Sequence, residues 1–252
     1  MEQLAFTALL NRLFGAGVLM LLQALHIPVK HPNTPISNSF AMEVLVVLLL
    51  GIFFTAVRMR LSVERPGGLQ HTMEAINGFV ADLARDTIPD HSERYVPYLT
   101  VLALFILLGN LIGLVPGLES PTAVPVVPLG CALFTWFYYH FHGVRANGGL
   151  GYLKHFIGPQ DKDIPVVLRI FLPILMFPIE AFSHLARVMS LTVRLFANMF
   201  AGEMVTLVFF SLIPLGVPLV FEGLHIGVSI IQTYIFVLLA AAYLGEATAH
   251  GH

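Results

Sequence analysis

Long apolar stretches separated by short polar ones dominate this chain of 252 residues. Each is close to or longer than the ~20 apolar residues that cross a bilayer as a helix. Residues 101–108 read VLALFILL, without the apolar–polar alternation of a transmembrane β-strand. The pattern predicts an all-α polytopic membrane protein with about five transmembrane helices. Their predicted ranges are 40–59, 98–118, 121–142, 166–208 and 219–245.

The first 37 residues differ from the rest. Residues 1–27 are apolar, but Glu2 precedes the run, Asn11 and Arg12 interrupt it, and no small-residue cleavage site follows, so the segment is a poor signal peptide. We interpret it as a membrane-associated segment that lies at the interface rather than spanning. Prolines make 26–37 an extended connector. The expected division is an N-terminal segment, 1–37, and a helical membrane domain, 38–252.

One predicted helix is amphipathic. The stretch GLQHTMEAINGFVADLARDTI, which begins at Gly68, has apolar residues at three- and four-residue spacing, with charged residues elsewhere on the helical wheel. This spacing predicts a helix that lies on the membrane surface. Its apolar positions are Leu69, Met73, Ile76, Phe79, Val80 and Leu83.

Composition agrees with a membrane location and excludes several functions. Apolar residues make up 57% of the chain and charged residues only 11%, against about a quarter charged in soluble domains. The net charge of −2 gives no support to nucleic-acid binding. One cysteine excludes a disulfide framework or a thiolate metal cluster. The pair His140 and His142 has no third ligand nearby and fits an interfacial aromatic belt better, so we expect no metal and no cofactor.

Basic residues set the expected topology, because cytoplasmic loops are enriched in Lys and Arg. Nine of the 13 basic residues lie within 58–94 and 145–169, in or beside two loops, whereas the turns at 119–120 and 211–222 have none. Alternation of these sides across five crossings predicts an external N-terminus and a cytoplasmic C-terminus.

The segment from 180 to 203 concentrates charge inside a membrane helix. It contains Arg187 and Arg194, and an arginine at the middle of a membrane helix costs ~2.5–3.5 kcal/mol unless it has a partner or a water-filled cavity. Five other polar residues of the segment form one stripe within ~40° of Arg194 on the helical wheel, whereas Glu203 lies roughly opposite. The stripe contains Glu180, Ser183, Arg187, Ser190 and Asn198. His184 lies ~80° from it.

Protonation chemistry separates the roles of these residues. Arginine stays protonated in proteins, so Arg194 can act only as a fixed charge. Glutamate and histidine exchange protons in an accessible pH range, which makes Glu180, Glu203 and His225 candidates for a proton relay. On the last helix, His225 shares a face with other polar and aromatic residues at four- and seven-residue steps. These are Ser229, Gln232, Phe236 and Tyr243.

Two other functions fit parts of the pattern. A secondary transporter would use Arg187 and Arg194 to bind an anionic solute near the midplane, but the internal repeats common in such proteins are missing. An intramembrane hydrolase would need a nucleophile and a base, and the adjacent Ser183 and His184 point ~100° apart on a helix.

Length adds a geometric expectation. A continuous helix over 166–201 would extend ~54 Å at 1.5 Å per residue, against a hydrocarbon core of ~30 Å, so it would tilt by more than ~50°. Alternatively, Pro173 and Pro178 kink or end the helix.

The sequence SLTVRLFANMFAGE at 190–203 closely resembles the signature of subunit a of the F-type ATP synthase membrane sector. GNLIGLVPG, RLSVERPGGLQ followed by GFVADL, and HIGVSIIQTYIFVLLAAAYL are also similar to this family, so the resemblance covers roughly 38–246. It implies a non-catalytic stator subunit of the bacterial inner membrane, with two long, steeply tilted final helices. Its expected partners are the c-ring, which supplies the ion-binding site, the peripheral stalk subunit b and the lipid bilayer.

The resemblance also implies roles for individual residues. Arg194 matches the essential arginine that faces the c-ring carboxylates. Some family members have an acid where this chain has Gly113, so we do not expect an external route through an acid at that position. The other matched positions are Asn198 and Gln232 as polar neighbours of the arginine, Glu203 and His225 in the external half-channel, Glu180, Arg187 and Ser190 in the cytoplasmic half-channel, and Asn110 as a further polar channel residue.

Overall fold

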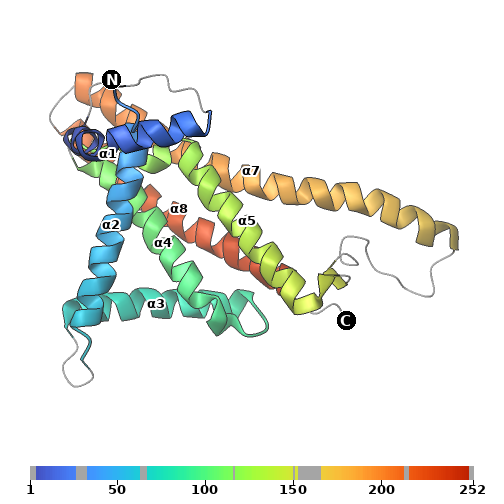
Figure 1. The fold of residues 1–252 in the computed structure, drawn as a ribbon. Coiled ribbons are helices and arrows are strands. Elements are labelled where there is room, and N and C mark those ends of the chain that lie inside the picture. Colours follow the sequence, from blue (N-terminus) through green and yellow to red (C-terminus); the bar gives the residue numbers. More distant parts are fainter. Residues whose placement is uncertain are drawn as a thin grey trace. The chain divides into compact units, whose positions relative to one another are not determined.

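The computed structural model describes residues 4–26, 33–62, 67–115, 117–149, 151–152, 166–212 and 216–249, with 166–172 as backbone. All regular elements within these ranges are helical, which confirms the predicted fold class (Figure 1). In chain order they are α1 (Ala5–Ala24), α2 (Asn38–Met59), α3 (Gly68–Thr87), η1 (Ser92–Arg94), α4 (Val96–Leu111), η2 (Ile112–Leu114), η3 (Pro121–Ala123), α5 (Val126–Asn147), α7 (Val166–Leu212) and α8 (Val217–Thr248).

Five helices within the described ranges are long and apolar enough to cross a membrane. They are α1, α2, α4 with its η2 extension, α7 from Pro173 onward, and α8. Five spans were also predicted from the sequence, but that set included 121–142, which corresponds to α5, and did not include the N-terminal segment, which corresponds to α1. By length and composition α1 qualifies, whereas α5 does not, because Tyr, His and Arg side chains crowd its second half. The interfacial location of 1–27 stays a prediction.

The longest helix, α7, is continuous over 47 residues, with Pro173 and Pro178 inside it. The alternative in which these prolines end the helix is therefore wrong. A proline removes one backbone hydrogen bond from a helix interior, and the flanking turns keep the helical path here. At 1.5 Å per residue α7 extends ~70 Å, and the 32 residues of α8 extend ~48 Å. Both exceed a ~30 Å hydrocarbon core, as the steep tilt requires.

Other boundaries also differ from the sequence expectation: the span predicted over 98–118 ends with η2 at Leu114, and α5 begins at Val126 because η3 occupies Pro121–Ala123. The polar loop predicted over 143–165 begins later, because α5 continues to Asn147, and residues 153–165 lie outside the described ranges. Of the predicted connector 26–37, residues 27–32 also lie outside them. The side chain of Asn11 binds the backbone N–H of Ile36 at 3.0 Å and its carbonyl at 3.1 Å, which ties the end of the connector to α1.

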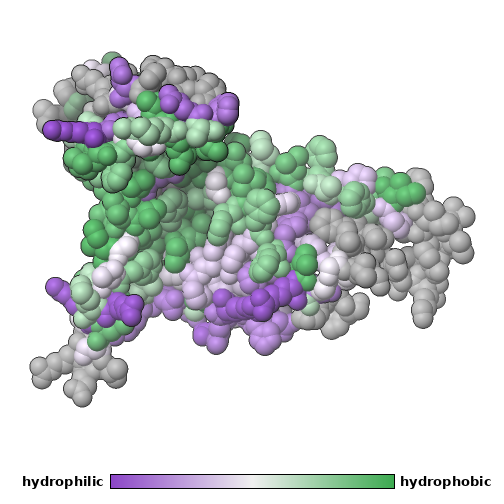
Figure 2. All heavy atoms as spheres, viewed as in Figure 1, coloured by the Kyte–Doolittle hydropathy of each residue, from purple (hydrophilic) through white to green (hydrophobic). Residues whose placement is uncertain are grey.

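The chain folds into two compact units, and each contains segments distant in sequence. Unit 1 comprises Met1–Gln70, Leu104–Val127 and Phe196–Ile231, and unit 2 comprises His71–Ala103, Pro128–Leu195 and Gln232–His252. Both contain parts of α4, α7 and α8. In unit 1, α1 lies across the start of α2, whose surface is hydrophobic along most of its length (Figures 1 and 2). The division at residue 37 stays a prediction.

The predicted amphipathic helix is present as α3. It buries Val80 and Ala84, and in unit 2 Asn77 accepts a hydrogen bond from Thr100 of α4 at 3.3 Å. Phe79 contacts the ring of Tyr234 on α8 at 6.0 Å between centroids. Hydrophilic residues gather along the helix in Figure 2, which agrees with one packed and one polar face.

A close backbone approach in unit 2 leads to a stability prediction. A Cβ atom at Gly245 of α8 would lie 2.5 Å from the carbonyl oxygen of Thr87, whereas one at Gly130 of α5 would meet nothing within 4 Å. We expect Gly245→Ala to lower the free energy of unfolding by about 1–3 kcal/mol, because backbone must move. Gly130→Ala should raise it by up to about 1 kcal/mol through helix propensity. Denaturant titration in detergent micelles measures both, and equal stabilities would contradict the tight contact.

Candidate functional site

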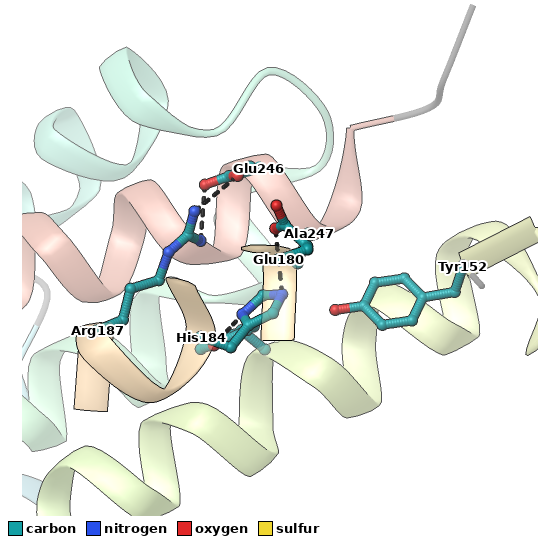
Figure 3. Close-up of a pocket in the computed structure, with 7 residues that line it drawn as sticks. Tyr152, Glu180, His184, Arg187, Glu246 and Ala247 are labelled. Atoms are coloured by element: carbon teal, nitrogen blue, oxygen red, sulfur yellow. Dashed lines mark hydrogen bonds and ion pairs between the residues drawn. The ribbon is translucent and has the colours of Figure 1, made fainter. Parts of the chain in front are cut away.

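An ion pair in unit 2 joins α7 to α8. The guanidinium of Arg187 binds both carboxylate oxygens of Glu246, each at 2.8 Å (Figure 3). The guanidinium also lies 4.8 Å from the ring centroid of Tyr243, within range of a cation–π contact. The side chain of Arg187 is 18% exposed and that of Glu246 is 50% exposed. The fixed charge at 187 is therefore neutralised within the chain.

A second polar group lies beside this pair. Glu180 lies 3.4 Å from Nε2 of His184, one turn later on α7, and Nδ1 of His184 lies 2.8 Å from the hydroxyl of Tyr139 on α5 (Figure 3). Tyr152 borders the same small pocket and directs its hydroxyl toward His184 in the figure. The pocket has a volume of about 10 Å³, room for about one water molecule.

The phenol of Tyr152 stays protonated at neutral pH. Burial raises the pKa of Tyr152 to about 12, although the charge of Arg187 acts in the opposite direction. A Cβ atom at Gly143 would lie 2.5 Å from the Tyr152 ring, so the glycine leaves the space that the ring occupies. The hydroxyl therefore remains both a donor and an acceptor at the pocket.

Arg194 has different surroundings from Arg187. Its side chain is exposed, and its guanidinium donates one long hydrogen bond of 3.5 Å to Ser190 on the same helix. Within the described ranges no acidic side chain pairs with it. Two arginines of one helical stripe thus differ: one is paired with a carboxylate, and the other presents its charge at the surface. This difference disfavours a solute site formed by both.

Unit 1 contains its own polar site, around Glu203 of α7. The carboxylate accepts a hydrogen bond from the backbone N–H of Ser120 at 3.0 Å. A Cβ atom at Gly113 would lie 3.0 Å from that carboxylate oxygen, so glycine is needed for this approach. Glu203 also lines a cavity of about 450 Å³ together with Glu119, Glu222 and His225. The cavity brings the predicted pair Glu203 and His225 to one space.

His225 is nearly enclosed beside α7. It is 6% exposed, and a Cβ atom at Gly202 would lie 2.6 Å from its Nδ1 atom. The Nε2 atom is buried and has no hydrogen-bond partner in the described part of the chain. The imidazole therefore has a ring nitrogen that is not committed to a structural hydrogen bond.

Asn110 joins this site through a chain of hydroxyl groups. Its Oδ1 atom accepts from Thr122 at 2.7 Å, and its amide donates to the Ser229 carbonyl at 3.4 Å. The hydroxyls of Ser120 and Thr122 lie 2.8 Å apart. All of these groups are buried. The turn that contains Ser120 and Thr122 thus links Asn110 of α4 to the carboxylate of Glu203 by hydrogen bonds.

The predicted residues therefore fall into two groups. Glu203, His225 and Asn110 come together in unit 1, and Glu180 and Arg187 come together in unit 2. Ser190 is exposed beside Arg194. Asn198 and Gln232 are partly exposed and belong to different units.

Sequence reasoning missed several residues of both sites. Glu246 lies three residues after Tyr243 and continues the polar face that begins at His225, so helical periodicity contained a signal for it. Tyr139, Ser120 and Thr122 had no such signal, because each meets its partner through tertiary contacts between distant segments.

The contacts of His184 and His140 argue against a hydrolase site and a metal site. Both ring nitrogens of His184 are engaged, one by Glu180 and the other by Tyr139, and neither is shown in contact with Ser183. His140 hydrogen-bonds the Trp136 carbonyl at 2.9 Å, and aromatic rings surround it, as expected of an aromatic belt. In the part of the chain that is described, no three His, Cys, Asp or Glu side chains are arranged to hold a metal ion.

Comparison with known proteins identifies the same family that the arginine motif at 190–203 resembles. The family model of the ATP synthase A chain matches residues 39–245, almost the range expected from the motifs. The chain belongs to the ATP synthase subunit a family. Membership in this family decides against the transporter and hydrolase alternatives.

Similarity to individual members of the subunit a family extends over most of the chain. ATP synthase subunit a of Koribacter versatilis (strain Ellin345) is 57% identical over 251 residues, 100% of this chain and 99% of that protein. ATP synthase subunit a of Solibacter usitatus (strain Ellin6076) is 49% identical over 218 residues, 86% of this chain and 90% of that protein. That of Sulfurihydrogenibium sp. (strain YO3AOP1) is 35% identical over 209 residues, 83% and 96% respectively.

The ion pair Arg187–Glu246 is expected to contribute measurable stability. We predict a coupling energy of about 1 kcal/mol between Arg187→Gln and Glu246→Gln in a double-mutant cycle, modest because Glu246 is half exposed. Each single change should cost more than the double change. The cycle of Arg85→Gln and Asp82→Asn on α3 is the control, since that pair is 59% and 74% exposed and should couple by less. Equal coupling in both cycles, from denaturant titration, would contradict the prediction.

Proposed function

We propose that the chain is the ion-translocating stator subunit of a rotary F-type ATP synthase. In this proposal it forms two aqueous half-channels that pass protons to and from c-ring carboxylates, with Arg194 between them. The observation that carries the proposal is the difference between the two arginines. Arg187 is neutralised by Glu246, whereas Arg194 is exposed and has no acidic partner among the described residues. A partner of opposite charge on another subunit would complete it.

The chemistry follows from the cost of charge in lipid. A c-ring carboxylate that takes up a proton becomes neutral and can enter the bilayer without the penalty of an ion. Arg194 favours the ionised form of the carboxylate that faces it, by charge attraction. Since arginine does not lose its proton, it also blocks direct proton transfer between the half-channels. Ion flow is then coupled to rotation.

The site of unit 1 is assigned to the external half-channel. Its cavity of about 450 Å³ supports access for water, and Glu203 and His225 supply titratable groups at that cavity. The buried Nε2 of His225 is available to accept a proton. Asn110, with Thr122 and Ser120, lines the path with groups that donate and accept hydrogen bonds.

The site of unit 2 is assigned to the cytoplasmic half-channel. Glu180 borders its pocket and is the proton acceptor, and Arg187 holds the nearby carboxylate of Glu246 in place. Ser190 contacts Arg194 and orients its guanidinium. Asn198 and Gln232 are proposed polar neighbours of the same guanidinium.

The proposal includes partners and orientation. The c-ring faces Arg194, and the peripheral stalk subunit b binds the same stator. The chain is a non-catalytic subunit that crosses the bacterial inner membrane several times, with the N-terminus outside and the C-terminus in the cytoplasm. The distribution of basic residues supports this orientation.

The fixed charge at position 194 gives the central test. We predict that Arg194→Ala abolishes ATP synthesis driven by an ion gradient, while the chain still inserts and assembles, because the ring carboxylate loses its electrostatic partner. ATP synthesis in inverted membrane vesicles measures the effect. Arg85→Ala on α3 is the control and should keep wild-type synthesis, since it removes an exposed surface charge. Normal coupled synthesis in Arg194→Ala would refute the assignment.

The external half-channel gives a second test. Simultaneous Glu203→Gln and His225→Gln should slow proton uptake from that side by about tenfold or more, because both acid–base groups at the cavity are lost. Proton flux is measured in liposomes that contain the intact enzyme. Glu74→Gln, at an exposed position of α3, should leave the flux unchanged. Unchanged flux in the double variant would count against the assignment of this cavity.

A further inference from the structure

His184 stands between two groups that can exchange protons. It is 8% exposed on α7, with Glu180 one turn earlier on the same helix at 3.4 Å from Nε2. Tyr139 of α5 lies 2.8 Å from Nδ1. Both ring nitrogens are therefore engaged by oxygen atoms.

The proposal rests on the function proposed above for the unit 2 site. We propose that His184 is a second proton carrier of this half-channel, which exchanges a proton with Glu180 and is oriented by Tyr139. In the transfer, the O–H bond of protonated Glu180 breaks and an N–H bond forms at Nε2 of neutral His184. The products are a carboxylate and an imidazolium in contact, and release of the proton to water restores the neutral imidazole.

The hydroxyl of Tyr139 fits both states of the imidazole. When His184 carries its proton on Nδ1, this N–H donates to the Tyr139 oxygen, and it continues to do so in the imidazolium. A hydrogen bond to the charged form stabilises that form. If the neutral ring instead carries its proton on Nε2, the hydroxyl rotates and donates to Nδ1. Tyr139 thus holds the ring in position through the whole cycle.

The charged groups that face His184 in the described part of the chain are two carboxylates and one guanidinium. Around its pocket lie Glu180, Arg187 and Glu246, with the neutral hydroxyl of Tyr152, and the ring of His140 lies 4.7 Å from that of His184. Because Glu246 neutralises Arg187, an imidazolium at 184 faces no uncompensated cation among the described residues. Glu246 is half exposed and borders the same pocket, so the pocket gives the released proton a way to solvent.

The experiment compares His184→Gln with wild type in the intact enzyme reconstituted into liposomes. Glutamine keeps polar contacts but cannot carry a proton. Proton flux at a fixed membrane potential is measured between pH 5 and 9 on the cytoplasmic side. We expect a fall of about tenfold, smaller than the 10²–10⁴ of a lone acid–base group because Glu180 still exchanges with water. The inflection that histidine adds to the pH profile should disappear.

His140→Gln is the matched control, because it changes a histidine of the same aromatic cluster that we place outside the relay. It should keep both the flux and the inflection. Tyr139→Phe should lower the flux less than His184→Gln and keep the inflection, since the carrier remains. Wild-type flux and profile in His184→Gln, or the same loss in His140→Gln, would overturn the proposal. If His184→Gln does not assemble, Tyr139→Phe decides: wild-type flux in that variant overturns the oriented relay.

The two proposals fail in different ways. Coupled ATP synthesis in Arg194→Ala would remove the stator function, whatever the behaviour of His184. Loss of synthesis in Arg194→Ala together with an unchanged pH profile in His184→Gln would remove only the second carrier.

Discussion

A guanidinium keeps its charge, and a membrane makes an isolated charge costly; this constraint organises the second half of the chain. The charge of Arg187 is compensated by the carboxylate of Glu246 on the neighbouring helix and by a cation–π contact with the ring of Tyr243. Arg194 has no acidic partner within the described ranges and lies exposed. In the function proposed above, Arg194 is therefore the charge that is available to a moving carboxylate of another subunit.

Close packing against glycine residues fixes the positions of several titratable side chains. The carboxylate of Glu203 reaches the Ser120 N–H across Gly113, and the ring of His225 lies against Gly202. Glycine permits both approaches because it has no Cβ atom. In unit 2, Gly143 makes room for Tyr152 in the same way. Glycine residues thus make room for the side chains of Glu203, His225 and Tyr152.

Sequence reasoning predicted much of this arrangement, for identifiable reasons. Of the seven long helices in the described ranges, five were expected as membrane spans and α3 as an amphipathic helix, since apolar runs and helical periodicity are local features. Whether Pro173 and Pro178 end the helix depends on tertiary support of the flanking turns, which periodicity does not contain. The end of α5 was placed too early because Gly143 and the polar residues after it look like a loop until tertiary contacts are known, such as the hydrogen bond from Asn147 to the Ala247 carbonyl.

The sequence by itself determined the helical membrane fold, the family and the stripe that contains both arginines, because all three depend on residue types at fixed local spacing. Tertiary structure alone decided which arginine is neutralised, since Glu246 is 59 residues away from Arg187. Tertiary structure also decided that the hydroxyl of Tyr139 hydrogen-bonds His184 and that the backbone N–H of Ser120 donates to Glu203. A charge or a hydroxyl acquires its role from its nearest partner, and partners on other helices are brought near only by packing.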